Sequence, residues 1–223
     1  MSDLIPVHGN YQELESYRNS VIIYDGTVDF CGRFLRIGDR TTDQMTQAAR
    51  SGKQNIVEGC MASGTSTETE IKLLGVARAS LEELLEDYRD HLRVRSLPLW
   101  EKNDVRVSAI RQLSSRKDRT YETYKTYLEQ GHNSPELFCN LMISLIHQTN
   151  YLLDRQLKSL EQHFAENGGI RERMYRTRNA EKNVQREKGL TLLREVYREL
   201  AKLNQPTLME KVTKVAEILK NKL

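Results

Sequence analysis

Seven basic side chains lie between residues 171 and 188, against three acidic ones, Glu172, Glu181 and Glu187. That stretch has a net charge of +4, while the whole chain has +3, so the remainder is at −1. Arginine binds phosphate through a planar fork of N–H donors, and an aromatic ring can stack on a base. The basic stretch is therefore our candidate nucleic-acid interface. Its candidate contact residues are Arg171, Arg173, Tyr175, Arg176, Arg178, Lys182 and Arg186.

A second interpretation of the same stretch is a charged surface helix that pairs with acidic residues of this protein. An acidic run suited to that role precedes it in the sequence. This run is either a solvated helix face or an interface that meets Arg78, Arg89 or the arginines of a neighbouring subunit. Its members are Glu82, Glu83, Glu86, Asp87 and Asp90.

Candidates for catalysis are weak. Bundles that hold two metal ions need Glu-x-x-His on two helices, and this sequence does not supply that pair of motifs. A nucleophilic serine at Ser51 or Ser80 needs a histidine base, and only His91 is near either segment. The three cysteines are widely spaced, which predicts buried, reduced thiols. We expect no enzymatic activity, no metal and no cofactor.

The elements that carry these residues all read as helices, and no strand pattern of any length occurs. The first helix, from about 11 or 16 to 36, has an expected buried face of Val21, Tyr24, Val28, Cys31, Phe34 and Leu35. The second begins at Thr41 or Thr42 and is stopped by Gly59. Its expected inward face is small, which permits close approach of a neighbour: Met45, Ala48, Ala49, Gly52 and Ile56.

The third helix, about 68 to 95, begins at a predicted capping box, Thr67-x-x-Glu70. It has two adjacent apolar stripes, wider than one antiparallel neighbour covers. The stripes therefore indicate burial on two sides and favour a homo-oligomer. They contain Ile71, Leu74, Leu81, Leu85, Tyr88 and Leu92, and beside them Leu73, Ala77 and Leu84.

Further helices are expected over 100–113, up to 129, and over 135–166, where Ser134-Pro135 is a strong start and Asn167-Gly168-Gly169 a stop. Beyond the basic stretch, apolar residues at helical spacing predict a hairpin of helices over 190–203 and 208–219. Gln205-Pro206 separates the two. The fold class is all-α.

Two segments resemble a known family. Residues 48–59, AARSGKQNIVEG, and 76–84, VARASLEEL, are similar to four-helix-bundle proteins encoded in intervening sequences of bacterial 23S ribosomal RNA genes. The structural-motif residues of this resemblance are Ser51, Asn55, Glu58, Gly59, Ser80 and Glu83. The segment NGGIRERMYR at 167–176 resembles a C-terminal suffix of some members.

The resemblance implies an up-down antiparallel four-helix bundle, which we place over 1–166, and a basic suffix over 167–188. The helical hairpin, which we place over 189–223, rests on its apolar spacing alone. The resemblance also implies no enzymatic activity. The family is similar to the accessory variability protein of diversity-generating retroelements, a pentamer whose basic surfaces bind nucleic acid and a reverse transcriptase. Here the bundle portion is near neutral, so we assign the nucleic-acid contact to the suffix.

Two functional hypotheses follow. One is an oligomeric adaptor, pentameric by the resemblance, that binds RNA or DNA and has a protein partner such as a reverse transcriptase. The other is a protein-only scaffold whose hairpin docks on a partner. No run of 18 apolar residues and no basic-then-apolar leader occurs, so we expect a cytoplasmic protein without membrane contact.

Overall fold

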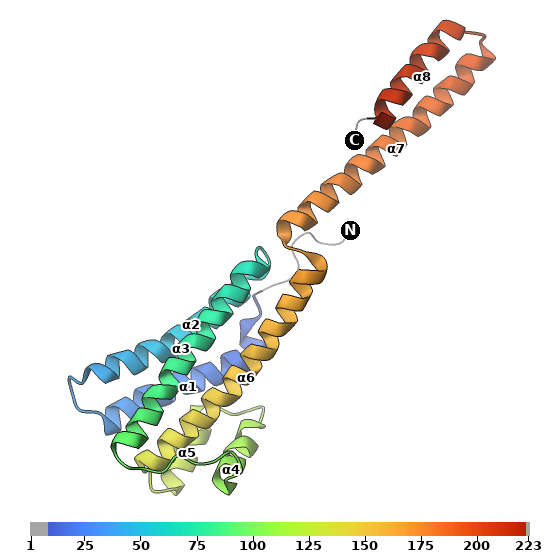
Figure 1. The fold of residues 1–223 in the computed structure, drawn as a ribbon. Helices are drawn as coiled ribbons and strands as arrows, with labels where there is room; N and C mark the ends of the chain where they lie inside the picture. The colour runs from blue at the N-terminus through green and yellow to red at the C-terminus, as the bar shows by residue number, and fades with distance from the viewer. Residues whose placement is uncertain (1–8, 222–223) are drawn as a thin grey trace. The chain divides into compact units, whose positions relative to one another are not determined.

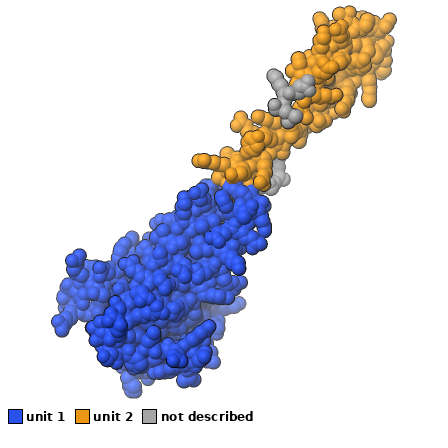
Figure 2. Space-filling view, viewed as in Figure 1, with its two compact units in different colours: residues 1–169 blue, residues 170–223 orange. Residues whose placement is uncertain are grey.

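The computed structural model describes residues 9–221, and within that range the chain is all-helical, without a strand (Figure 1). The all-α prediction is confirmed. The chain divides into two compact units, residues 1–169 and 170–223 (Figure 2). Each unit has its own helices, and they are described separately.

Four long helices form the body of unit 1. Helix α1 contacts α2 and α6, and α3 contacts the same two helices, so each of the four has two neighbours among the others. Two short helices, α4 and α5, lie in the connection between α3 and α6. The elements are η1 (Tyr11–Glu13), α1 (Glu15–Phe34), α2 (Arg40–Ala62), α3 (Thr67–Val94), α4 (Val105–Ser114), α5 (Tyr121–Gln130) and α6 (Pro135–Asn167).

The helix ends follow capping chemistry, but not always at the predicted residue. Asp39, rather than a threonine, caps α2 by accepting a hydrogen bond from the Thr41 amide at 2.9 Å. Ser66 caps α3 by accepting from the Thr69 amide at 3.1 Å, so the predicted capping box at Thr67 is one residue late. The predicted start of α6 is confirmed, since Ser134 Oγ accepts from the Leu137 amide at 3.2 Å.

The buried face of α1 matches the prediction at Cys31, which is buried, and departs from it at Val28. Val28 is 46% exposed, whereas Ile22, Ile23 and Phe30 are buried. Apolar residues surround this helix on several sides, so their spacing alone did not select the face. The inward side is completed by Thr27, whose hydroxyl donates to the Ile23 carbonyl at 2.8 Å and accepts from the Tyr88 hydroxyl at 3.0 Å.

The predicted small face of α2 is confirmed, because all five of its residues are buried. At Gly52, a Cβ atom would lie 2.8 Å from Leu81 Cδ2, so α3 packs directly on the glycine backbone. Gly59 does not stop the helix, which continues to Ala62. Instead Gly59 is buried against Leu74, where an added Cβ atom would lie 3.4 Å from Leu74 Cγ, an ordinary van der Waals distance.

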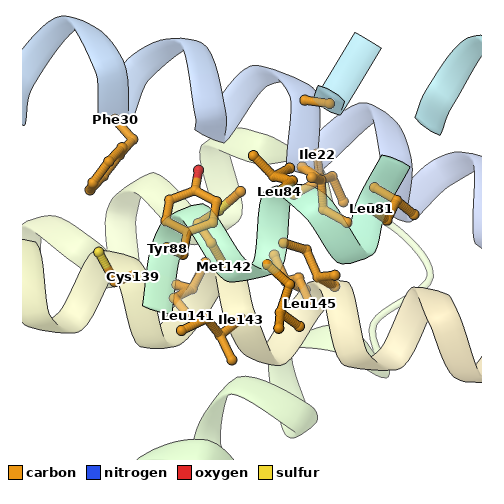
Figure 3. Close-up of a cluster of buried hydrophobic side chains, with 14 of the residues drawn as sticks. Ile22, Phe30, Leu81, Leu84, Tyr88, Cys139, Leu141, Met142, Ile143 and Leu145 are labelled. Carbon is orange, nitrogen blue, oxygen red and sulfur yellow. The ribbon is translucent and has the colours of Figure 1, made fainter. Parts of the chain in front are cut away.

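The wide apolar surface of α3 is covered within the chain. Helices α2 and α6 both pack on it, and Leu81, Leu84 and Tyr88 are fully buried. Figure 3 shows this part of the core, with Leu141 and Leu145 of α6 beside the α3 side chains. Two-sided burial therefore does not require a second copy of the protein, and the argument for an oligomer from these stripes is lost.

Unit 2 is a hairpin of α7 (Ile170–Lys202) and α8 (Pro206–Asn221). Helix α7 is continuous across 188/189, where the sequence suggested a division between the basic stretch and the hairpin. Gly189 costs roughly 1 kcal/mol relative to alanine in a helix interior, which its helix-forming neighbours offset. Helix α8 packs on the C-terminal half of α7, where Leu190 is the sole buried residue within 170–221.

Candidate nucleic-acid interface

All seven predicted contact residues lie in the N-terminal half of α7. Five of them are exposed, while Arg173 and Arg186 are half-buried. The Tyr175 side chain is 69% exposed, so its ring is accessible for stacking. This half of α7 consists largely of good helix formers, which allows the helix to extend beyond the region that α8 covers.

The helix arranges these residues unequally. Arg171, Tyr175, Arg178, Lys182 and Arg186 follow one another at intervals of four, three, four and four residues. At roughly 100° per residue this spacing places them on one face, over roughly 22 Å of helix. We call these five residues the basic stripe.

The remaining charges lie away from the stripe. Arg173 and Arg176 are offset from Arg171 by two and five residues, which places them on other sides of α7. By the same count, Glu172, Glu181 and Glu187 also fall outside the stripe. The helix therefore separates four cations and a tyrosine from the nearby carboxylates.

The side of α7 that carries the stripe is covered by α8 further along the helix. A Cβ atom at Gly189 would lie 3.7 Å from Leu219 of α8, so Gly189 faces that helix. Gly189 is three residues after Arg186 and seven after Lys182, hence on the stripe side. The stripe thus precedes, along α7, the position at which α8 covers this face.

The stripe cations are mostly available for contact. Within 170–221, Arg171, Arg178 and Lys182 form no ion pair. The Glu181 carboxylate instead accepts a hydrogen bond from Gln185 Nε2 at 2.9 Å. Because no described residue of unit 2 neutralises these three cations, an approaching polyanion can pair with them.

The acidic run of α3 has partners inside unit 1. Glu86 pairs with Arg89 at 2.6 Å, and Asp90 pairs with Arg93 at 2.7 Å. In each pair the two residues are one helical turn apart on the exposed surface of α3. This agrees with the interpretation of the run as a solvated helix face. Arg78 turns to α6 instead, where it pairs with Asp154 at 2.5 Å.

Of the other three carboxylates of the run, Glu82 and Asp87 differ in environment. Glu82 accepts a hydrogen bond from Asn150 Nδ2 on α6 at 2.9 Å. Burial raises the pKa of Asp87 to about 6, with smaller contributions from the neighbouring charges of Glu83 and Asp90.

The structural-motif residues divide into two groups. Ser51 and Ser80 join α2 to α3 through their hydroxyls at 2.9 Å. Asn55 Nδ2 donates to the Ser51 carbonyl, also at 2.9 Å, within α2. Glu58 and Glu83 are exposed and form no ion pair within 9–221, which separates them from this polar contact.

Other candidate chemistry is structural in character. Burial raises the pKa of Cys31 to about 11 and that of Cys139 to about 12, which disfavours their nucleophilic thiolates. His91 packs edge-on against Phe30, with ring centroids 4.8 Å apart, and burial lowers its pKa to about 4. Among residues 9–221, no three His, Cys, Asp or Glu side chains cluster as metal ligands.

The apolar side chains of the hairpin are only partly used in the contact between its two helices. Exposed apolar side chains continue along both helices of the hairpin, beyond those that α7 and α8 use against each other. Their signal was the excess of aliphatic residues over what one helix pair can bury. They are Leu192, Val196, Leu203, Leu208, Val215 and Ile218.

The described helices include no membrane-spanning segment, and the comparisons with known proteins provide no relative. No helix within 9–221 is long and apolar enough to cross a bilayer. No protein family, curated protein or solved structure matches the chain.

Proposed function

We propose that this protein is a non-catalytic adaptor that binds nucleic acid through the basic stripe of α7. The observation that carries the proposal is the alignment of Arg171, Arg178, Lys182 and Arg186 with Tyr175 on one exposed helix face. Cations contact phosphates without regard to sequence, and the tyrosine can stack on an unpaired base. A single-stranded RNA fits both contacts, because its bases are accessible.

The proposed adaptor is a homo-oligomer, and the hairpin supports this part. A two-helix unit with one buried residue gains little from its own core, since most helical stability comes from tertiary packing. Its exposed aliphatic side chains would be covered if hairpins of several subunits packed together. A pentamer is the number that the family resemblance implies.

For unit 1 we propose the up-down four-helix bundle of the intervening-sequence family. The pairwise contacts among α1, α2, α3 and α6 support it, together with the motif residues Ser51 and Ser80 at the α2–α3 contact. By the same resemblance, a reverse transcriptase or another nucleic-acid enzyme is the proposed protein partner.

The test compares two double variants with equal loss of charge. Arg171→Gln/Arg178→Gln removes two stripe cations, and Arg173→Gln/Arg176→Gln removes two cations from other sides of the same helix. Binding of a fluorescent 20-nucleotide mixed-sequence RNA is measured by anisotropy at low salt. We expect the stripe variant to bind about tenfold more weakly, from about 0.7 kcal/mol for each exposed contact, and the other variant to stay within about threefold.

Equal losses in the two variants would show that net charge, rather than the stripe, determines binding. Circular dichroism of both variants checks their helix content. We expect it to be unchanged, because all four substituted residues are exposed or half-buried.

The second candidate function is the protein-only scaffold, and the exposed apolar face of the hairpin favours it. A wild-type protein that binds no RNA at low salt, yet self-associates through α7 and α8, would leave the scaffold as the function. Leu192→Ser/Val196→Ser should then abolish self-association in sedimentation without changing the unfolding of unit 1.

A further inference from the structure

A cavity of about 540 Å³ lies in unit 1. Its walls come from α3, α4 and α6 and from the segment between α3 and α4. Its volume is within the range of small-molecule sites. Part of the lining is apolar, supplied by Leu99, Trp100, Val107 and Ile143.

The wall at Trp100 is held in place by hydrogen bonds. The Trp100 amide donates to Asn140 Oδ1 at 2.8 Å, and its indole N–H donates to Glu136 at 2.7 Å. Asn140 in turn donates to the Pro98 carbonyl at 3.0 Å. Arg106 lies over the indole ring, 3.9 Å from a ring centroid. This part of the cavity is therefore formed before any ligand arrives.

The charged part of the lining is entirely basic. Arg89, Lys102 and Arg111 all contribute, and no aspartate or glutamate lines the cavity. Lys102 and Arg111 form no ion pair within the described part of the chain. Arg89 Nη1 is bound to Glu86, but its Nε is buried without a hydrogen-bond acceptor among the described residues. A buried N–H without an acceptor is destabilising, so an acceptor there would stabilise the site.

Uncharged polar groups complete the lining. Ser144, His147 and Gln148 follow along α6. Burial and the nearby Arg89 lower the pKa of His147, while Glu82 acts in the opposite direction. The imidazole is consequently neutral at pH 7 and adds hydrogen-bonding capacity without a further charge.

We propose that this cavity binds a small amphipathic anion. Its apolar body would lie against Trp100, Val107 and Ile143, and its phosphate or carboxylate group would pair with Arg89, Lys102 and Arg111. A ligand without the anion would leave Lys102 and Arg111 unneutralised, and one without the apolar body would leave the indole wall uncovered. This inference is independent of RNA binding by α7.

The single tryptophan of the chain is Trp100, so intrinsic fluorescence reports on this cavity directly. The probe is 8-anilinonaphthalene-1-sulfonate, with the neutral N-phenyl-1-naphthylamine as its matched counterpart. We expect the anionic probe to quench Trp100 saturably and to bind at least fivefold more tightly than the neutral one.

The variants are Lys102→Gln and Arg111→Gln, both at exposed positions where folding should be unaffected. Each should weaken the anionic probe about three- to tenfold and leave the neutral probe unchanged. Arg116→Gln is the control, because Arg116 follows α4, pairs with Asp118 and does not line the cavity. Equal effects of all three variants, or no quenching of Trp100, would overturn the proposal.

Competition then identifies the source of the anion. Adenosine monophosphate and decanoate each combine an oxyanion with a larger body, one a nucleoside and the other an alkyl chain. Displacement of the probe by either supports the proposal and names the class of ligand. Displacement by neither at millimolar concentration, or equally by inorganic phosphate alone, would contradict it.

Discussion

The two units of this protein have similar secondary structure and very different interiors. Unit 1 buries a continuous cluster that joins α1, α2, α3 and α6, whereas the described part of unit 2 buries Leu190 alone. Packing therefore determines the fold of unit 1, and helix propensity with one short helix–helix contact determines that of unit 2. A helical hairpin that buries so few of its apolar side chains leaves them available for contact with other molecules.

Substitution of a tyrosine in each unit gives the largest expected contrast. Tyr88 is fully buried and bonded to Thr27, so Tyr88→Ala should lower the free energy of unfolding of unit 1 by about 3–5 kcal/mol. Tyr175→Ala should change it by less than about 0.5 kcal/mol. Urea unfolding followed by Trp100 fluorescence measures both. A small loss for Tyr88→Ala would mean that the core of unit 1 is not packed as described.

A pair of glycines on facing helices tests the close approach of α2 and α3. A new Cβ at Gly52 would meet Leu81 Cγ at 2.9 Å, so Gly52→Ala should destabilise unit 1 by about 1–3 kcal/mol. At Gly75 of α3 nothing lies within 4 Å, and Gly75→Ala should stabilise it by about 0.5–1 kcal/mol. The same urea titration measures the change in the free energy of unfolding for both variants. Changes of the same sign would refute the packing argument.

Glu70 gives unit 1 a pH-dependent stability. Burial raises the pKa of Glu70 from 4.5 to about 7, so the fold disfavours its charged form. Stability associated with this group is present below pH 4.5 and is lost as the pH rises towards 7. Glu70→Gln should therefore stabilise unit 1 by about 1–2 kcal/mol at pH 8, after allowance for solvent screening, and by nearly nothing at pH 4.

The exposed Glu58→Gln is the control substitution for that experiment. A gain for Glu70→Gln that is the same at pH 4 and pH 8 would exclude ionisation as its cause.

The smallest expected effect is in unit 2. Gly189→Ala adds a Cβ at ordinary contact distance from Leu219, so it should stabilise α7 by about 0.5–1 kcal/mol. Thermal melting followed by circular dichroism at 222 nm detects it as a later loss of helix. An earlier loss would mean that α8 approaches α7 more closely at this point.

The sequence was most informative where neighbours in the chain are neighbours in space. The ends of α6 follow from Ser134, Pro135 and Gly168, which act within a few residues of themselves. The basic stripe was predictable for the same reason, because one helix carries all of it. The periodicity also sorts Arg173 and Arg176 away from the stripe once the helix is known to be continuous.

Features that depend on tertiary contacts were not predictable. The buried face of α1 is decided by Tyr88 and its bond to Thr27, sixty-one residues away in the chain. Trp100 was expected inside a helix, but it precedes the cap at Asp104, which accepts from the Arg106 amide at 2.8 Å. The cavity collects Arg89, Arg111 and His147 from three helices, and no local pattern links them.

The most direct test of the central claim is the salt dependence of RNA binding by the wild-type protein and by the variant Arg171→Gln/Arg178→Gln/Lys182→Gln/Arg186→Gln. Four phosphate contacts on a single strand give a slope of log affinity against log salt of about −3 for each stripe engaged. We predict that slope or a steeper one for the wild type, and a slope near zero for the variant. An unchanged slope in the variant, or a wild type whose affinity is indifferent to salt, would contradict binding through the basic stripe.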